Sequence, residues 1–293
     1  MTDTPDAPRP TSEKPLAPGL YLVSTPIGNL EDITLRALRV LRLADRIACE
    51  DTRQTAKLLG HFGIRTPTVS YHTHNEASRS SELLGALKAG ARIAVVSDAG
   101  MPGIADPGAL LAAEAIAANV PVIPVPGPNA ALTALIASGL PAESFAFHGF
   151  LPSKEGARRT LLESLRAANA QTTHILYETP HRILDALTDI VAVFGPTQPI
   201  VLARELTKLH EEFLRGPASG LLTTLQSRPS IRGEMVLLLG PTEPTTTAPT
   251  TLAAEVSALI AQGLSEKDAL KQAARSRNIG KSDAYREWQR TRR

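Results

Sequence analysis

Residues 92–134, RIAVVSDAGMPGIADPGALLAAEAIAANVPVIPVPGPNAALTA, contain two strand-to-helix junctions in close succession, and these junctions decide the fold class. Residues 92–97 are mostly β-branched residues and alanine, which is typical of a strand covered on both faces. Asp98 therefore stands at the carboxyl end of that strand. Glycine and proline dominate the next residues, so a sharp turn must follow. Asp106, followed by a proline, predicts the cap of a helix over residues 107–118.

The second junction follows directly along the chain. Residues 120–125 predict the next strand, and residues 126–128, PGP, end it before a helix that begins near Asn129. Ligands of parallel α/β sheets bind outside the carboxyl ends of the strands, so the two junctions could line one pocket. Two tight connections without a ligand are the alternative. The sequence contains no G-x-G-x-x-G and no G-x-x-x-x-G-K-[ST], which disfavours a dinucleotide or a nucleoside triphosphate.

Length and composition bound the rest of the chain. Its 293 residues, 43% hydrophobic and 20% charged, suffice for two modest domains with their own cores. The apolar runs are short, so no membrane span is predicted. Residues 1–18 hold five prolines and both signs of charge, which indicates a disordered leader and no signal peptide. Cys49 is the only cysteine, so an intramolecular disulfide or thiolate metal cluster is excluded and a reducing cytoplasm is favoured.

The net charge of +2 hides an asymmetry along the chain. Residues 271–293 hold eight Lys or Arg against two acidic residues, a local balance of +6, which leaves 23 basic and 27 acidic residues in the remainder. A basic tail on a mildly acidic body suggests a polyanionic partner. The alternative is an ordinary solvated helical end.

Further strands and helices flank the quoted stretch. On its N-terminal side we expect strands at 20–24, 46–49 and 68–71, with helices at 31–43 and from about 51 to 60. On its C-terminal side we expect strands at 144–150, 173–177, 200–204, 211–215 and 234–239, with helices at 154–168, 180–194 and 219–227. The last three strands are separated by only one short helix, so part of this second sheet should be antiparallel.

The chain is therefore predicted as two α/β domains, at 19–127 and 128–240, followed by a Pro/Thr-rich linker at 241–251 and a basic helical module at 252–293. In the module, Ser265 with Asp268 resembles a capping box, and Ser282 is expected to cap the last helix. Trp288 is interpreted as a core anchor, with base stacking as the alternative. The whole module is expected to bind RNA phosphates.

Polar residues follow several of the predicted strands. Asp51 or Thr52 is the expected cap of a helix, a role compatible with a function for the adjacent Arg53. Glu205 and Lys208 follow the strand at 200–204, and a carboxylate and an ammonium three residues apart on a turn can hold and deprotonate a hydroxyl. A surface ion pair is the alternative. The two histidines in the segment 72–75, HTHN, have no third ligand at a usable spacing, so no metal site is predicted.

Eight motifs, in this order and spacing, resemble those of the ribosomal RNA small subunit methyltransferase I family, which belongs to the tetrapyrrole methylase superfamily: TPIGNLEDIT, CEDTR, SDAGMPGIADPG, PGPNA, FHGFLP, YETPHR, RELTK and GEMVL. The resemblance implies a homodimeric two-domain α/β methyltransferase with S-adenosylmethionine in the cleft between the domains. The implied substrate is a cytidine in the decoding region of 16S rRNA, methylated on its ribose 2′-oxygen, in naked rRNA or in the small ribosomal subunit.

The same resemblance implies roles for individual residues. The cofactor would be held by Pro26, Ile27, Asp98, Ala99, Gly100, Met101, Gly103, Ile104, Asn129, Ala130, Tyr177, Leu206 and Met235. The RNA would be faced by Arg53, His181, Arg182, Arg204 and Lys208. Glu205 is the expected catalytic base, with Lys208 beside it. Ala105 and Asn129 depart from the Ser or Thr common in the family, so side-chain hydrogen bonds there are expected to differ.

Two alternatives remain at this stage. A methyltransferase acting on a tetrapyrrole or a diphthamide precursor would share the fold, the cofactor cleft and the dimer, but it would leave the basic tail without a purpose. A non-enzymatic RNA-binding assembly factor with a vestigial cleft would show no saturable binding of S-adenosylmethionine.

Overall fold

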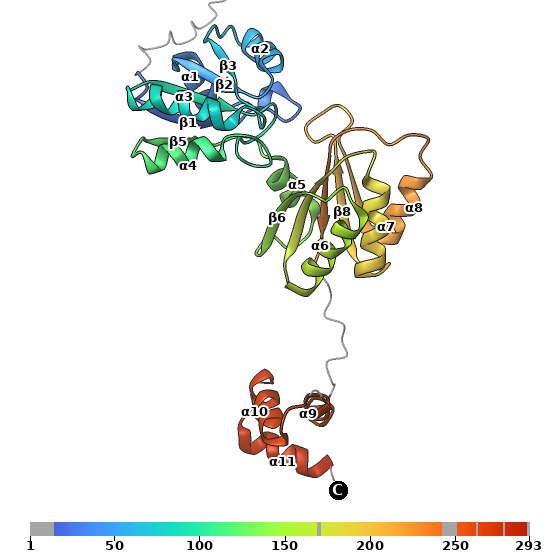
Figure 1. Cartoon of the computed structure of the whole chain (residues 1–293). Coiled ribbons are helices and arrows are strands. Elements are labelled where there is room, and N and C mark those ends of the chain that lie inside the picture. The colour runs from blue at the N-terminus through green and yellow to red at the C-terminus, as the bar shows by residue number, and fades with distance from the viewer. Residues whose placement is uncertain (1–14, 169–170, 242–250, 262, 278, 292–293) are drawn as a thin grey trace, which may run out of the picture. The chain divides into compact units, whose positions relative to one another are not determined.

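The computed structural model describes residues 15–168, 171–241, 251–261, 263–277 and 279–291 (Figure 1). The chain divides into two compact units, a main body over Met1–Pro241 and a C-terminal unit over Thr242–Arg293. Most of the predicted leader and most of the predicted linker lie outside the described residues. Leu16, which the prediction assigned to the leader, is buried in the core beside Tyr21, whose hydroxyl donates to the Ala17 carbonyl. No helix in the part of the chain described here is both long and apolar enough to span a membrane.

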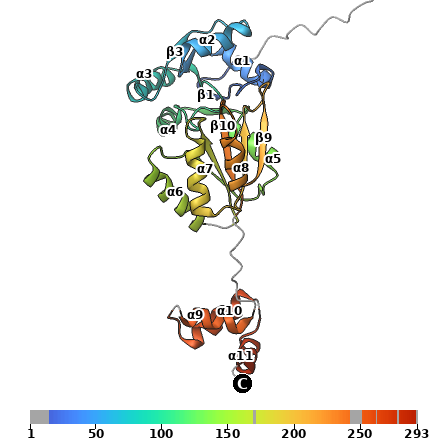
Figure 2. The ribbon, with the colours of Figure 1, turned by 90° about the vertical axis from the view of Figure 1, so that its right-hand side faces the viewer.

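The first sheet of the main body is entirely parallel. Its strands are β1 (Gly19–Val23), β2 (Arg46–Cys49), β3 (Thr68–Ser70), β4 (Arg92–Val96) and β5 (Val122–Val125), in the order β3-β2-β4-β1-β5. Helices α1 (Leu35–Leu43), α2 (Thr52–His61), α3 (Glu76–Lys88) and α4 (Ala109–Ala117) flank it (Figures 1 and 2). Alternate residues of β4 enter two hydrophobic cores, Ala94 and Val96 on one face and Ile93 and Val95 on the other. The predicted strand buried on both faces is confirmed.

The second sheet is mixed, as predicted. Its strands are β6 (Phe145–Phe150), β7 (Thr173–Glu178), β8 (Pro199–Arg204), β9 (Glu212–Pro217) and β10 (Met235–Leu239), in the order β6-β7-β10-β8-β9, and only β6 and β7 are parallel. Helix α5 (Ala130–Ser138) packs on one face. Helices α6 (Glu155–Ala168), α7 (Ile183–Phe194) and α8 (Ala218–Gln226) pack on the other.

The C-terminal unit is a small helical domain with its own core. It consists of α9 (Leu252–Ala261), α10 (Glu266–Ser276) and α11 (Lys281–Thr291). Trp288 is only 6% exposed among leucine, valine and alanine side chains, which confirms the predicted core anchor. The predicted capping box is also confirmed, because the Asp268 amide donates to Ser265 Oγ at 3.2 Å.

Several helix starts differ from the sequence-based expectation. Helix α4 begins at Ala109 after Gly108, because the Gly103 amide donates to the Pro107 carbonyl and closes a turn there. Asp106 is therefore no helix cap. The helix expected over 31–43 divides into a 3₁₀ turn (Leu30–Asp32) and α1, which Thr34 caps.

Two further helix starts and one whole helix also differ. Helix α7 begins at Ile183, because the Arg182 and Ile183 amides both donate to the Thr179 carbonyl in a preceding turn. Ser282 lies inside α11, where the Gly280 carbonyl accepts the first helical amides, so the expected serine cap is wrong. Helix α3 was not predicted.

Candidate active site

Three loops meet at the carboxyl edge of the first sheet. The loops after β1 and β4 pair, with the Thr25 amide donating to the Gly100 carbonyl at 2.9 Å and the Gly100 amide to the Thr25 carbonyl at 3.0 Å. Gly100 has a φ of +84°, a conformation that residues with a Cβ rarely adopt. The Asp51 amide, after β2, donates to Asp98 Oδ1 at 3.0 Å. The loops after β1, β2 and β4 therefore converge at one edge of the sheet.

The turn after β8 in the second sheet carries backbone strain. Glu205 and Thr207 have φ values of 52° and 64°, although neither is glycine, and such residues cost on the order of 1–3 kcal/mol each. Hydrogen bonds hold this conformation, since the Glu205 amide donates to the Glu234 carbonyl at 2.9 Å and the Lys208 amide to the Glu205 carbonyl at 3.0 Å. Strain of this kind concentrates where a ligand or a reaction requires a fixed geometry.

The loop after β1 packs directly against this strained turn. A Cβ on Gly28 would lie 2.5 Å from Lys208 Cγ and 2.8 Å from the Leu206 carbonyl oxygen, so only glycine permits the approach. Ile27 and Leu206 pack in the same hydrophobic cluster. Loops from both sheets therefore build one wall together.

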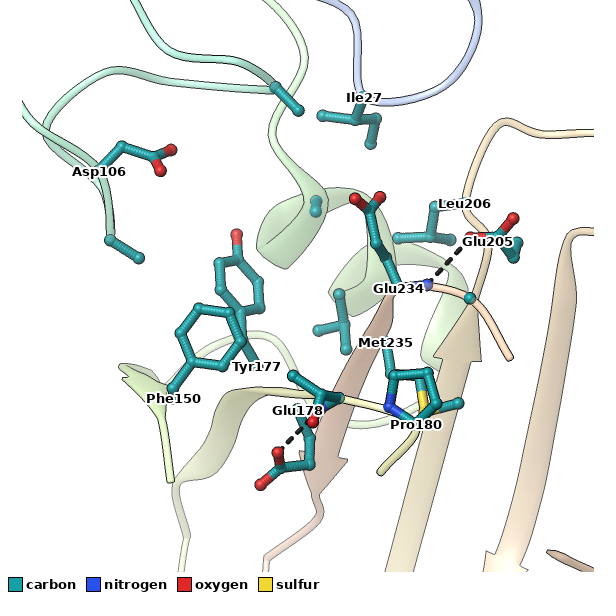
Figure 3. Close-up of a pocket in the computed structure, with 16 residues that line it drawn as sticks. Ile27, Asp106, Phe150, Tyr177, Glu178, Pro180, Glu205, Leu206, Glu234 and Met235 are labelled. Carbon is teal, nitrogen blue, oxygen red and sulfur yellow. Dashed lines mark hydrogen bonds between the residues drawn. The ribbon is translucent and has the colours of Figure 1, made fainter. Parts of the chain in front are cut away.

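A cavity of about 400 Å³ lies where these loops meet α5, β7 and β10 (Figure 3). Its apolar walls are formed by Ile27, Ala99, Ala105, Ala130, Phe150, Tyr177, Pro180, Leu206, Met235 and Val236. The Phe150 and Tyr177 rings meet edge to face with their centroids 5.6 Å apart. Four acidic residues, Asp106, Glu178, Glu205 and Glu234, also line the cavity, together with Thr179 and Gly233, and no Lys or Arg is among the lining residues of the described chain.

The acidic residues of the cavity differ in the pKa of their carboxyl groups. Burial, reinforced by the nearby charges of Glu50 and Asp98, raises the pKa of Asp106 to about 6. Burial also raises the pKa of Glu178, against the opposing effects of its hydrogen bond from the Thr179 amide and the charge of Arg182. A cationic ligand would relieve the repulsion among these groups.

Glu205 lies in a hydrogen-bond network with one ammonium group. Lys208 Nζ donates to Glu205 Oε1 at 2.8 Å and to Glu234 Oε2 at 2.9 Å, and the Glu234 amide donates to the same Glu205 oxygen at 2.9 Å. The hydrogen bond from Lys208 holds the pKa of Glu205 below its usual value. Although burial opposes it, hydrogen bonding to Glu205 and Glu234 raises the pKa of Lys208. Both groups are therefore charged at neutral pH.

The structure places the expected cofactor residues in two sets. Those that line the cavity are Ile27, Ala99, Ala130, Tyr177, Leu206 and Met235. Those in the same loops but outside its lining are Pro26, Asp98, Gly100, Met101, Gly103, Ile104 and Asn129. Asn129 caps α5 by accepting the Leu132 amide at 2.9 Å, and its Nδ2 lies 3.4 Å from Met101 Sδ. Of the two expected catalytic residues, Glu205 lines the cavity and Lys208 contacts it through Glu205.

The four remaining residues expected to face RNA differ in the exposure and the bonding partners of their side chains. Among the described residues, Arg53 pairs with Asp51 of its own turn and has an 87% exposed side chain, and His181 is also exposed. Arg182 Nη2 donates to the Leu151 carbonyl and to Glu178 Oε2. Arg204 Nε donates to Glu212 Oε2 at 2.9 Å. Arg182 and Arg204 thus have structural partners within the main body.

Several of the residues that line the cavity were not predicted from the sequence. Asp106 was interpreted as a helix cap, and Ala105 only as a departure from the family pattern. Glu178 and Glu234 stand inside the quoted motifs YETPHR and GEMVL, so their position beside chosen residues was the available signal. Phe150 ends β6, and nothing in its local sequence indicates that it reaches a cavity shared with β7.

Comparison with known proteins identifies similar chains. The family model for Tetrapyrrole (Corrin/Porphyrin) Methylases matches residues 19–222. A Halalkalibacterium halodurans protein named ribosomal RNA small subunit methyltransferase I is 48% identical over 91% of this chain and 93% of its own length. The protein of the same name from Vibrio cholerae is 51% identical over 76% of this chain and 77% of its own length.

Solved structures share the fold at lower identity. Diphthine synthase matches with a TM-score of 0.59 at 15% identity, covering 75% of this chain and 89% of its own. Uroporphyrin-III C-methyl transferase from Thermus thermophilus, complexed with S-adenyl homocysteine, matches with a TM-score of 0.52 at 20% identity, covering 76% and 98%. These two likenesses concern the fold alone.

Proposed function

Because this chain belongs to the tetrapyrrole methylase family, and within it to the ribosomal RNA small subunit methyltransferase I family, we propose that it methylates the ribose 2′-hydroxyl of a cytidine in the decoding region of 16S rRNA. The coarser activity follows from the family: the chain is an S-adenosylmethionine-dependent rRNA methyltransferase. The alternative of a non-enzymatic assembly factor is therefore wrong. The nucleotide, the ribose position and the site in the rRNA make up the proposal.

The cavity supports the cofactor on which the proposal depends, through its combination of apolar walls and acidic residues. S-adenosylmethionine joins an adenine ring to a chain that carries a positive sulfonium and a positive ammonium. The apolar walls suit the ring, and the carboxylates suit the positive charges. The volume of about 400 Å³ lies within the range of about 300–1,000 Å³ typical of small-molecule sites. The residues present therefore fit this cofactor.

The assignment of individual residues to parts of the cofactor follows the family resemblance. The loop Asp98–Ile104, with Asn129 and Ala130, would hold the methionine and ribose parts, and Tyr177, Leu206 and Met235 would form the wall for the adenine. When bound, the cofactor supplies a methyl group activated by its sulfonium. The task of the protein is then to align the ribose oxygen and take up its proton.

We propose that Glu205 accepts the proton of the ribose hydroxyl. Glu205 is among the residues that line the cavity, and its carboxylate is ionised at neutral pH because Lys208 lowers its pKa, so it can accept a proton from a ribose hydroxyl. The strained turn at residues 205–208 fixes the carboxylate, and Lys208 fixes one of its oxygens. The lowered pKa makes Glu205 a modest base, which suffices where the hydroxyl proton becomes acidic as the new carbon–oxygen bond forms.

The proposal includes a homodimer that acts on rRNA in the cytoplasm. Leu132 and Ile136 lie four residues apart on α5 and are 43% and 81% exposed, so they share an apolar helix face suited to a second copy of the chain. Sedimentation of the wild type and of Ile136→Glu tests this part, and a dimer is expected only for the wild type.

Mapping of ribose methylation tests the reaction itself. Small-subunit rRNA from cells lacking the gene should miss one 2′-O-methylated cytidine in the decoding region, and complementation should restore it. Incubation of the purified protein with S-adenosylmethionine and either naked 16S rRNA or assembled subunits then identifies the accepted form. Methylation at another position, or on a base, would refute the proposal.

A further inference from the structure

The C-terminal unit carries a groove on α10 and α11 that the methyl transfer does not use. Its volume is about 710 Å³, and its lining includes three lysines, two carboxylates and one tyrosine. Lys267 and Lys271 are one helical turn apart on α10, and Lys281 and Tyr285 are one turn apart on α11. One face of each helix therefore contributes to the groove.

The three ammonium groups are available to an anion. Lys267, Lys271 and Lys281 are all exposed, and among the described residues none of them forms an ion pair. Two arginines of this unit differ, since Arg277 pairs with Glu255 at 2.6 Å and Arg286 with Asp283 at 2.5 Å.

The two carboxylates of the groove have structural roles. Glu266 Oε1 accepts the indole N–H of Trp288 at 3.0 Å, which satisfies a buried donor of the core. Asp268 Oδ2 accepts the Ser265 hydroxyl at 2.6 Å as part of the capping box of α10. Both carboxylates are held by these partners, whereas the lysines are free to meet a ligand.

The aromatic residue of the groove narrows the class of ligand. Tyr285 is 54% exposed, while Trp288, three residues later on the same helix, is buried. An exposed ring beside unpaired cations is the combination that binds single-stranded nucleic acid, because bases stack on the ring and phosphates meet the cations. A duplex would keep its bases paired and offer no face for stacking.

We propose that this groove binds a single-stranded segment of RNA, with Lys267, Lys271 and Lys281 on phosphates and an unpaired base on the Tyr285 ring. The groove provides RNA affinity outside the catalytic cavity. The identity of that RNA as the rRNA substrate rests on the proposed function, whereas the chemistry of the groove does not.

Fluorescence anisotropy of the full chain with a labelled 12-nucleotide single-stranded RNA, and with the same strand annealed to its complement, tests the proposal. Tyr285→Ala should weaken single-strand binding roughly 5- to 100-fold, and Tyr285→Phe should bind like the wild type because the ring remains. The triple variant Lys267→Gln/Lys271→Gln/Lys281→Gln should lower the salt slope by about 2, since each phosphate contact on a single strand contributes about 0.7.

The matched control is Lys57→Gln/Lys88→Gln/Lys154→Gln, which removes the same charge from exposed positions of the main body. It should leave the salt slope much less changed. An unchanged slope in the groove variant, a slope reduced equally in both variants, or equal binding by Tyr285→Ala and Tyr285→Phe would overturn the proposal. Methylation of 16S rRNA is measured separately, so an inactive wild type would refute the proposed function while the oligonucleotide result still judged the groove.

Discussion

The cavity of the main body and the groove of the C-terminal unit use charge in opposite ways. The cavity is lined by four acidic residues and, within the described part of the chain, by no Lys or Arg, and its key charges are held by hydrogen bonds, as between Lys208 and Glu205. The groove is lined by three exposed lysines without ion-pair partners in the described chain. Fixed charges favour a single geometry and hence a chemical step, whereas free charges bind a polyanion through many similar contacts.

The largest effect is expected from removing the fixed charge of Glu205. Glu205→Gln keeps the size of the side chain but removes the proton acceptor, so the single-turnover rate of methylation should fall by about 10²–10⁴-fold. Calorimetry should find the affinity for S-adenosylmethionine within a few-fold of wild type.

Glu234→Gln is the matched control, because Glu234 also lines the cavity and accepts from Lys208, but its side chain is 75% exposed. A much smaller loss of rate is expected. If Glu205→Gln turns over at the wild-type rate, Glu205 is not the base, and alignment of the ribose oxygen alone accounts for the reaction.

The second prediction concerns the close approach that builds the cavity wall. Gly28→Ala places a methyl group 2.8 Å from the Leu206 carbonyl oxygen, so the two loops must separate. The free energy of unfolding of the main body should fall by about 1–3 kcal/mol, the usual effect of overpacking. Denaturant unfolding followed by circular dichroism measures it.

Gly85→Ala is the matched control for the same substitution. Gly85 lies inside α3, and an added Cβ there meets no atom within 4 Å. Stability should rise by roughly 0.5–1 kcal/mol, because alanine loses less conformational freedom in a helix. Equal effects of the two substitutions would mean that the loops do not depend on the contact at Gly28.

The close approach at Gly28 also shows where sequence-based prediction stops. The strands and the loops after them could be predicted because hydrophobic runs and Gly/Pro turns are local signals. The parallel order of the first sheet then brings Asp51 beside Asp98 without further information. The contact between Gly28 and the turn at 205–208 joins two sheets, and no local pattern encodes which loops of separate sheets meet.

The wrong prediction of a helix cap at Asp106 has a similar physical origin. Asp106 followed by Pro107 has the sequence of a helix cap, but the turn closed at Pro107 delays the helix and leaves the carboxylate in the cavity. The resemblance implied that Arg182 and Arg204 face RNA, and this assignment stays a prediction. Their partners, among them Glu178 and Glu212, become visible only in the folded chain.

The third prediction uses the titration of Asp106. Its pKa is raised to about 6, mainly by burial, so the group is ionised above pH 6 and neutral below. A cation in the cavity favours the ionised form, so the affinity for S-adenosylmethionine should fall with decreasing pH, approaching tenfold per pH unit below pH 6. Calorimetry between pH 5 and 8 measures this dependence.

Asp106→Asn should flatten that pH profile. Because the folded chain binds this proton more tightly than the unfolded chain, the native state loses stability as pH rises from about 4 to 6 and above. Asp106→Asn should therefore unfold at a higher denaturant concentration at pH 7.

The smallest effect is expected at Arg53, which carries an exposed cation on the main body beside the acidic cavity. Among the described residues, its side chain bonds to the carboxylate oxygens of Asp51 in the same turn, and such exposed pairs contribute little to stability. If Arg53 meets one phosphate, Arg53→Gln should lower the salt slope of RNA binding by less than 1 and leave the pH profile of cofactor binding unchanged.

Arg182→Gln should behave differently, because it removes the partner of the buried Glu178 and a donor to the Leu151 carbonyl, so the main body should lose stability. Should Arg53→Gln instead change cofactor affinity with no change in salt slope, the exposed cation would belong with the fixed charges of the cavity, and the division between fixed and free charge would not follow exposure.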